Sequence, residues 1–338
     1  MLRAPKCAIV LEAGLQAALK ARQAVPLLQL QVRAASQVSK LLPRPDDFSK
    51  RHIGPRDADQ VKMLKLLGYE SLNELTDATV PENIRLNREL MVEEPLGEHH
   101  LLDRIREISD KNEVWRSYIG MGYHNCCVPH AILRNIFENP GWTTQYTPYQ
   151  PECAQGRLQS LLNYQTMVTD MTGLAVANAS LLDEGTAAAE AMGLCYRQNK
   201  RRKIYLSDKL HPQTIAVVQT RAIPLGLECI IGEAMEMDFS NRDVCCVIFQ
   251  YPDTTGNIMD FSNLVAEAKA NGTMSVCATD LLSLALLTPP GEFGCDIAVG
   301  TSQRLGIPLG YGGPHAGFFS CREPLVRLMP GRMIGVTR

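Results

Sequence analysis

The chain has 338 residues, of which 45% are hydrophobic and 21% are charged, so it can bury the core of one large α/β domain or about two smaller ones. Its net charge of −2 offers no basic face for nucleic acid. The cysteines stand in adjacent pairs and in apolar runs such as VCCVIF, with no CxxC and no His/Cys spacing suited to zinc. This usage predicts reduced, buried thiols rather than disulfides or a metal site.

The amino terminus differs in charge from the rest of the chain. Residues 1–45 contain seven Lys/Arg and one acidic residue, a charge of +6, which leaves −8 for the remainder. A basic, acid-poor and amphipathic segment is typical of an organellar transit peptide, so residues 1–40 predict import into the mitochondrial matrix. A disordered basic tail or a plastid address is the alternative. The apolar stretches are too short and interrupted to span a membrane, and no h-region indicates secretion.

The next segment predicts an extended arm followed by helices. Residues 41–56 are rich in proline and read as a linker or arm. Asp57 is predicted to cap a helix that Gly68 ends. Ser71 and Glu74 form the capping-box pattern of a second helix.

Two loops punctuated by Gly, Pro and Tyr follow, at residues 117–129 and 144–157. Loops stiffened in this way commonly hold binding groups against a scaffold. We therefore expect residues 57–150 to form a helical leader with substrate-side loops. For each polar side chain in them, a structural hydrogen bond is the more ordinary role. The substrate-pocket candidates are Tyr123, His124, Tyr149, Gln150 and Glu152.

From about Gln155 the pattern becomes that of an α/β domain, expected over residues 151–338. Short apolar runs without polar alternation suit strands that are covered on both faces. They alternate with helical segments in βαβ order. The predicted strands are 203–207, 244–250, 275–279, 296–300 and 317–320, and the predicted helices between them are about 185–198, 212–221 and 261–270.

The sequence SLLDEGTAAAEAM contains Gly185 and Thr186 at the start of an Ala-rich helix. Free amides at a helix start, a glycine and a hydroxyl form a natural seat for a phosphate. Asp183 and Glu184 would repel such an anion. An acidic first turn that favours its own helix dipole is the equal alternative.

Two further residues follow predicted strands. His211 precedes a helix at the edge where ligands gather in open α/β sheets, so its ring could stack on a flat cofactor or cap the helix. Asp280 could face a cofactor ring nitrogen or cap the helix that it precedes. The glycine-rich segment at 300–319 is neither a dinucleotide fingerprint nor a Walker loop.

Several long motifs together resemble one family, the glycine dehydrogenase P-proteins of the glycine cleavage system. They are SYIGMGYHN, TQYTPYQPE, NASLLDEGTAAAEA, FQYPDT, PPGEFGCDIAVG and LGYGGPHAGFF. The resemblance runs from about His52 to Arg338. It implies the pyridoxal-phosphate-dependent, aminotransferase-like fold of type I, here as a truncated large domain with the helical leader.

In that fold a lysine on a loop after a late strand holds the cofactor aldehyde. By its spacing to the GGP glycines, Gln303 stands at that position, and an amide cannot form a Schiff base. The family resembles two tandem copies of the fold, with the lysine on the carboxy-terminal copy. The resemblance therefore implies that this chain is the lysine-less amino-terminal copy, and that Gly185, Thr186, His211 and Asp280 are vestiges of a cofactor pocket.

The family reaction binds glycine through pyridoxal phosphate, releases CO2 and passes the aminomethyl group to the lipoyl arm of the H-protein. The resemblance implies glycine, the lipoylated H-protein and the carboxy-terminal half as partners, with a homodimer for the full-length form. The sequence ends directly after LVRLMPGRMIGVTR without a stop signal, which we interpret as a fragment that is inactive alone. The alternatives are a non-catalytic module that pairs with the catalytic half, and an autonomous pyridoxal-phosphate enzyme, which Gln303 disfavours.

Overall fold

The computed structural model describes residues 54–143 and 150–336. The predicted transit peptide, most of the linker and Tyr149 lie outside the described residues. The chain divides into two compact units between Trp115 and Arg116, and each is described by itself. The domain boundaries expected from the sequence stay predictions.

The first unit is helical. Gly68 ends the first helix at a positive φ of 81°, as predicted, because glycine adopts the left-handed conformation without strain. Asp57 does not cap this helix. It occupies the first helical position, after Arg56, where its carboxylate still faces the positive end of the helix dipole. The helices are α3 (Asp57–Leu67), α4 (Leu72–Thr79), η1 (Glu82–Ile84) and α5 (Glu98–Ser109).

The predicted cap of α4 is confirmed. The Ser71 hydroxyl accepts a hydrogen bond from the Glu74 amide at 3.1 Å. The Glu74 carboxylate in turn accepts from the Glu70 amide at 2.7 Å, one residue before the usual capping-box partner. No helix in the described ranges is long and apolar enough to cross a membrane.

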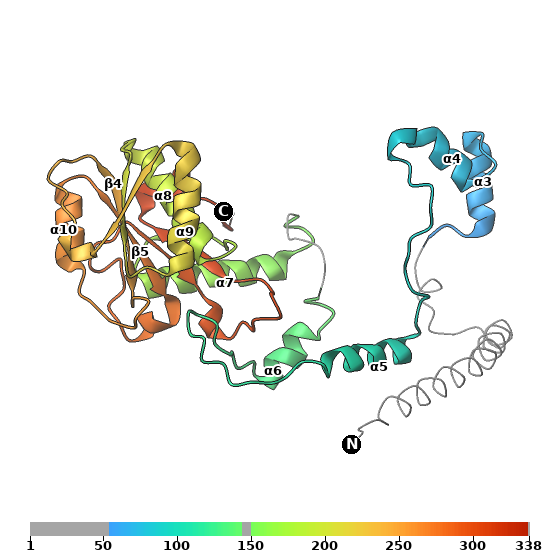
Figure 1. Cartoon of the computed structure of the whole chain (residues 1–338), viewed down its shortest axis with the longest axis horizontal. Helices are drawn as coiled ribbons and strands as arrows, with labels where there is room; N and C mark the ends of the chain where they lie inside the picture. Colours follow the sequence, from blue (N-terminus) through green and yellow to red (C-terminus); the bar gives the residue numbers. More distant parts are fainter. Residues whose placement is uncertain (1–53, 144–149, 337–338) are drawn as a thin grey trace, which may run out of the picture. The chain divides into compact units, whose positions relative to one another are not determined.

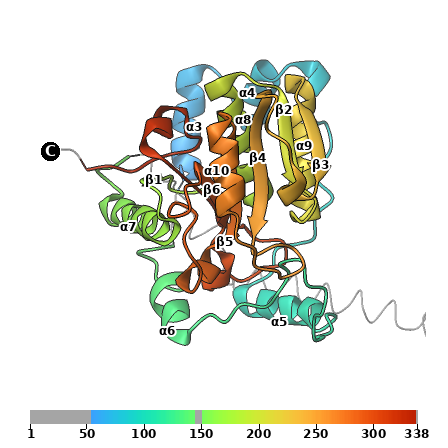
Figure 2. The same ribbon diagram turned by 90° about the vertical axis from the view of Figure 1, so that its left-hand side faces the viewer.

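The second unit is built on a seven-stranded mixed sheet, in the order β1-β7-β6-β5-β4-β2-β3. Strands β3, β2, β4, β5 and β6 run parallel, while β7 is antiparallel to β6 and β1. Figure 2 shows β4, β2 and β3 following one another towards one edge. The strands are β1 (Val176–Ala177), β2 (Lys203–Ser207), β3 (Glu228–Gly232), β4 (Val244–Tyr251), β5 (Met274–Asp280), β6 (Ile297–Thr301) and β7 (Gly317–Cys321).

All five predicted strands are confirmed, whereas β1 and β3 were not predicted. Strand β1 has only two residues, too few to show a pattern. Strand β3 is an edge strand whose residues are mostly partly exposed, so it lacks the apolar run of the inner strands. The helices and short helical turns are α6 (His130–Ile132), η2 (Leu133–Phe137), α7 (Gln155–Thr172), α8 (Glu184–Asn199), α9 (Pro212–Ala222), η3 (Ile223–Leu225), η4 (Ala234–Glu236), α10 (Ser262–Ala270), η5 (Leu281–Ala285), η6 (Gln303–Leu305) and η7 (Glu323–Leu328).

Helices cover both faces of the sheet, which gives three layers. Figure 1 shows α8 and α9 on one side of the strands and α10 on the other. One apolar core, with Met192 and Leu194 of α8, lies on the first face. The second core joins Val168 of α7 and Val265 of α10 to inner side chains such as Phe249. Burial on both faces explains why the inner strands are continuous apolar runs.

The sheet approaches the start of α8 closely. A Cβ atom on Gly317, the first residue of β7, would lie 2.8 Å from the backbone oxygen of Asp183. Only glycine fits this close approach. The amide of Leu181 also donates to the Gly317 carbonyl at 2.8 Å. These contacts hold the amino-terminal end of α8 against the edge of the sheet, beside the ends of the parallel strands.

Candidate functional site

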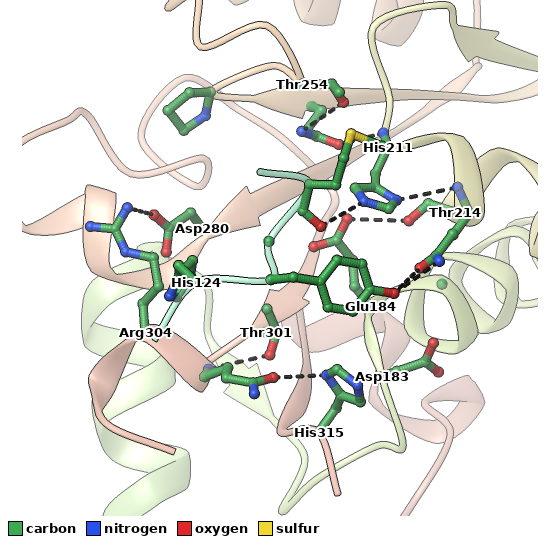
Figure 3. A pocket seen from close by; sticks show the side chains of 18 of the residues that line it. His124, Asp183, Glu184, His211, Thr214, Thr254, Asp280, Thr301, Arg304 and His315 are labelled. Atoms are coloured by element: carbon green, nitrogen blue, oxygen red, sulfur yellow. Dashed lines mark hydrogen bonds and ion pairs between the residues drawn. The ribbon is translucent and has the colours of Figure 1, made fainter. Parts of the chain in front are cut away.

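A cavity of about 500 Å³ lies at the carboxyl ends of the parallel strands. Residues that follow β2, β4, β5 and β6 line it, together with the start of α8 and the loop at Met121–His124 (Figure 3). In open α/β sheets this edge is where ligands bind. Further lining residues are Gly122, Gly185, Gln213, Gln250, Pro252, Thr254, Gly256 and Thr301.

The start of α8 presents two carboxylates to the cavity. Asp183 caps the helix, because its Oδ1 accepts from the Thr186 amide at 3.2 Å. Glu184 Oε1 accepts from the Thr214 hydroxyl at 3.2 Å. Protein surrounds Glu184, and this burial, together with the nearby charges of Asp183 and Asp280, raises the pKa of its carboxyl, against the opposing effects of Thr214 and His211. With Asp183 as the cap and Glu184 in the first turn, α8 has the acidic start of the second alternative.

His211 is held at both ring nitrogens. Its Nδ1 accepts from the Gln213 amide at 3.2 Å and so caps α9, and its Nε2 lies 3.0 Å from the carbonyl oxygen of Met121. These partners fit a ring with its hydrogen on Nε2. Its own backbone amide donates to Gln250 Oε1 at 2.7 Å. The capping role predicted for His211 is confirmed, and stacking stays a prediction.

Gln303 is 5% exposed and lines the cavity from the first position of η6, directly after β6. Its side-chain oxygen lies 2.7 Å from Nδ1 of His315, and its backbone amide donates to the Thr301 hydroxyl at 3.2 Å. Figure 3 shows Thr301 and His315 on this side of the cavity. No lysine is among the described residues that line the cavity.

Two other carboxylates of the cavity already have partners. Asp280 caps η5 through its Oδ1 and forms an ion pair with Arg304, 3.0 Å from its Oδ2 (Figure 3). The predicted capping role of Asp280 is thereby confirmed. Burial opposes ionisation of Asp253, but hydrogen bonds from Thr255 and Asn257 hold its pKa below the usual range. In the described part of the chain, Arg304 is thus the one guanidinium that lines the cavity, beside four carboxylates.

The structure brings together most of the predicted residues. Tyr123, His124, Gly185, His211, Asp280 and Gln303 all line the cavity. Tyr123 also bonds the side chain of Gln213 through its hydroxyl, at 3.0 Å. Thr186 contributes its amide to the cap of α8 and does not line the cavity, and Gln150 and Glu152 are exposed outside it.

The sequence interpretation did not single out Thr214, Gln250, Asp253, Arg304 and His315 as site residues. Asp253 lies two residues after the end of β4, and Arg304 lies three residues after the end of β6. The strand-end rule that selected His211 and Asp280 could have found both. His315 comes before an antiparallel strand, and the sequence does not reveal that strand's direction. No group of three or more His, Cys, Asp or Glu in the described ranges could hold a metal ion.

The three-layered sheet with its cavity at the carboxyl edge defines the class of this protein. It has the fold of the large domain of type I pyridoxal-phosphate-dependent enzymes. The family model described as glycine cleavage system P-protein matches residues 50–338. The chain belongs to this family.

Curated relatives agree with this assignment. The chain is 63% identical over 305 residues to human glycine dehydrogenase (decarboxylating), mitochondrial, a match that covers 90% of this chain and 30% of the relative. The glycine dehydrogenase (decarboxylating) of Nostoc punctiforme is 53% identical, and the match covers 86% of this chain and 30% of the relative. The chain therefore spans about a third of the length of these relatives.

A crystal structure of glycine decarboxylase (P-protein) of the glycine cleavage system, in inhibitor-bound form, is 34% identical with a TM-score of 0.76. The match covers 83% of this chain and 65% of that chain. The sphingosine-1-phosphate lyase of Burkholderia pseudomallei is 15% identical, with a TM-score of 0.50. The match covers 75% of this chain and 64% of the lyase, and it shows a shared fold alone.

The cavity does not fit pyridoxal phosphate. The cofactor needs an amine for its aldehyde, but the described residues that line the cavity include no lysine, and Gln303 turns its side-chain oxygen to His315. Its phosphate needs free amides and positive charge at a helix start, where Asp183 already occupies the Thr186 amide and Glu184 lies beside it. Asp280, the candidate for the ring nitrogen, is paired with Arg304.

Proposed function

We propose that this chain is the lysine-less amino-terminal lobe of a mitochondrial glycine decarboxylase. The complete enzyme would bind glycine through pyridoxal phosphate held by its carboxy-terminal half, release CO2 and pass the aminomethyl group to the lipoylated H-protein. This chain would supply structure and one wall of the site rather than the cofactor. A homodimer of the full-length form belongs to the same proposal.

The family match over residues 50–338 carries this proposal. The names of the human, mouse and chicken relatives support the mitochondrial location. Gln303, with an amide where the cofactor needs an amine, supports the assignment to the lobe without catalysis of its own.

The loop at Met121–His124 is the best candidate for the wall that this lobe would present to substrate. Tyr123 is fixed by its bond to Gln213, and the carbonyl of Met121 holds His211. His124 lines the cavity and has no hydrogen-bond partner in the described part of the chain. Tyr149, Gln150 and Glu152 stay candidates for the same wall.

The test is reconstitution. The 338-residue chain without residues 1–40 is co-expressed with the remaining carboxy-terminal part of the human relative, and exchange of the glycine carboxyl with bicarbonate is measured with pyridoxal phosphate and lipoylated H-protein. We expect exchange only when both parts are present. Each part alone is the control.

Two results separate the alternatives. Exchange by this chain alone, with an absorbance band of a Schiff base, would show an autonomous enzyme and contradict the proposal. Stable association of the two parts without exchange would favour the second candidate, a non-catalytic assembly module.

A further inference from the structure

The charge of the cavity points to a ligand other than the cofactor of the fold. Among the described residues, four carboxylates line it, those of Asp183, Glu184, Asp253 and Asp280, against one guanidinium, three imidazoles and no lysine. Arg304 is already paired with Asp280, so beyond the partial effect of His211 on Glu184 no guanidinium or ammonium group of these lining residues is left to offset the other three carboxylates. An anion entering this space would be repelled, and a cation would be attracted.

Two of those carboxylates, Asp183 and Glu184, each keep one oxygen available. They use Oδ1 and Oε1, respectively, for their hydrogen bonds, and no partner of the second oxygen occurs among the described residues. No fully buried side-chain oxygen or nitrogen in the described ranges lacks a partner. The second oxygens therefore reach accessible space, where they can accept hydrogen bonds from an ammonium group.

Gln303 supplies an independent observation. The residue is 95% buried, since its exposed fraction is 5%, and its side-chain oxygen is taken by His315. Its amide nitrogen Nε2 has no partner in the described part of the chain and, by the same reasoning, opens onto the accessible space of the cavity that Gln303 lines. Because solvent reaches this nitrogen, water can accept its hydrogen bond, and the side chain, held by His315, is placed to donate to a ligand oxygen instead. The cavity is thus complementary to a ligand that carries both a positive charge and an oxygen acceptor.

We propose that this cavity is a non-covalent binding site for a small primary amine that carries a neutral oxygen acceptor, such as an amino amide or an amino alcohol. The ammonium group binds the free oxygens of Glu184 and Asp183, and the acceptor takes the hydrogen bond of Gln303. A zwitterion binds more weakly, because its carboxylate enters a cavity with an excess of negative charge. The site goes beyond the decarboxylase role and does not depend on it.

The test compares probes of nearly equal size by ligand-observed saturation-transfer NMR on the full chain. Glycinamide has the ammonium group and the neutral carbonyl, acetamide lacks the ammonium group, and glycine replaces the carbonyl by a carboxylate. We expect glycinamide to bind, glycine to bind more weakly and acetamide not to bind. Inorganic phosphate is expected not to compete with glycinamide.

Matched variants locate the binding. Glu184→Gln keeps an acceptor for Thr214 but removes the charge, and is expected to weaken glycinamide binding about tenfold, the effect of losing a charged hydrogen bond. Gln303→Leu removes the donor and is expected to weaken glycinamide more than methylamine, which has no acceptor. Glu267→Gln, on the exposed side of α10, is the control and is expected to leave binding unchanged.

Circular dichroism and thermal unfolding confirm that each variant is folded before binding is compared. If Glu184→Gln does not fold, the comparison of glycinamide, glycine and acetamide on the unmodified chain decides. Absence of glycinamide binding, equal binding of acetamide, or displacement of glycinamide by phosphate overturns the proposal. None of these results bears on reconstitution of glycine exchange, so the two proposals fail separately.

Discussion

The middle of the sheet and its carboxyl edge are made by the same strands and yet differ in what their residues do. In the middle of β4, Val247, Ile248 and Phe249 have no exposed surface and pack against helices on both faces. A few residues further on, Asp253 and the neighbouring loops form a cavity rich in carboxylates. The middle of the sheet excludes water and charged groups, whereas the carboxyl edge places several carboxylates around the cavity.

This difference separates stability from function. Apolar packing in the middle follows from the need to bury surface. Carboxylates beside one another at the edge repel. Asp183 and Asp280 cap helices and Asp253 holds a turn, but none of these local roles requires the carboxylates to face one space. Like charges gathered around a cavity are the usual mark of a binding site. We therefore expect core substitutions to change mainly the free energy of unfolding and edge substitutions to change mainly binding.

The largest effect is expected in the core. Phe249→Ala would leave a cavity beside Phe261, whose ring centroid lies 4.2 Å from that of Phe249. We expect the free energy of unfolding to fall by about 3–5 kcal/mol, as for other buried aromatic truncations. Urea unfolding of the full chain measures it. A loss below about 1 kcal/mol would show that this face of the sheet is loosely packed.

A smaller effect is expected where the two regions meet. Asp183→Ala removes the cap of α8, and the free energy of unfolding should fall by about 1 kcal/mol. Asp183→Asn is the matched control, because asparagine keeps an acceptor for the Thr186 amide and removes only the charge. Thermal unfolding should place Asn closer to the unmodified chain than Ala. The reverse order would mean that the charge, not the cap, is what α8 requires.

Much of the fold could be predicted from the sequence, because strands buried on both faces appear in it as short, mostly apolar runs. The runs that became β4, β5 and β6 are mostly apolar, without polar alternation, and their short length between helical segments favoured strands over buried helices. Strand β3 was not predicted because its residues are exposed or only partly buried, so it lacks the apolar run of the inner strands. The cap at Asp57 was wrong by one position, a shift that a local pattern cannot resolve.

The candidate site could be predicted only in part, since a cavity depends on distances between elements. His211 and Asp280 were found because each stands at a strand end. The pairing of Asp280 with Arg304 and of Gln303 with His315 joins loops 24 and 12 residues apart in sequence, and no spacing rule indicates either pair. The absence of a lysine was visible, but the excess of carboxylates appears only once the loops converge.

Glu184 gives a third comparison of core and edge, because its contribution to the free energy of unfolding depends on pH. Burial raises the pKa of its carboxyl in the folded protein, so the folded state keeps this proton at higher pH than the unfolded chain does. Glu184 therefore favours folding fully below its unfolded pKa, and this contribution is lost as pH rises through the folded value. The facing groups on other elements are Thr214 and His211, which favour the ion, and Asp280, which opposes it.

Glu184→Gln cannot titrate, so it should be the more stable protein relative to the unmodified chain at high pH, with the difference shrinking as pH falls. The difference is expected to be smaller than that of either substitution above, because Thr214 and His211 already offset part of the burial. Urea unfolding of both proteins at about pH 5 and about pH 8 measures it. Glu267→Gln, exposed on α10, should show no such dependence. A difference that does not change with pH would mean that the cavity solvates Glu184 as water does, and that the edge carries its carboxylates at no cost to the fold.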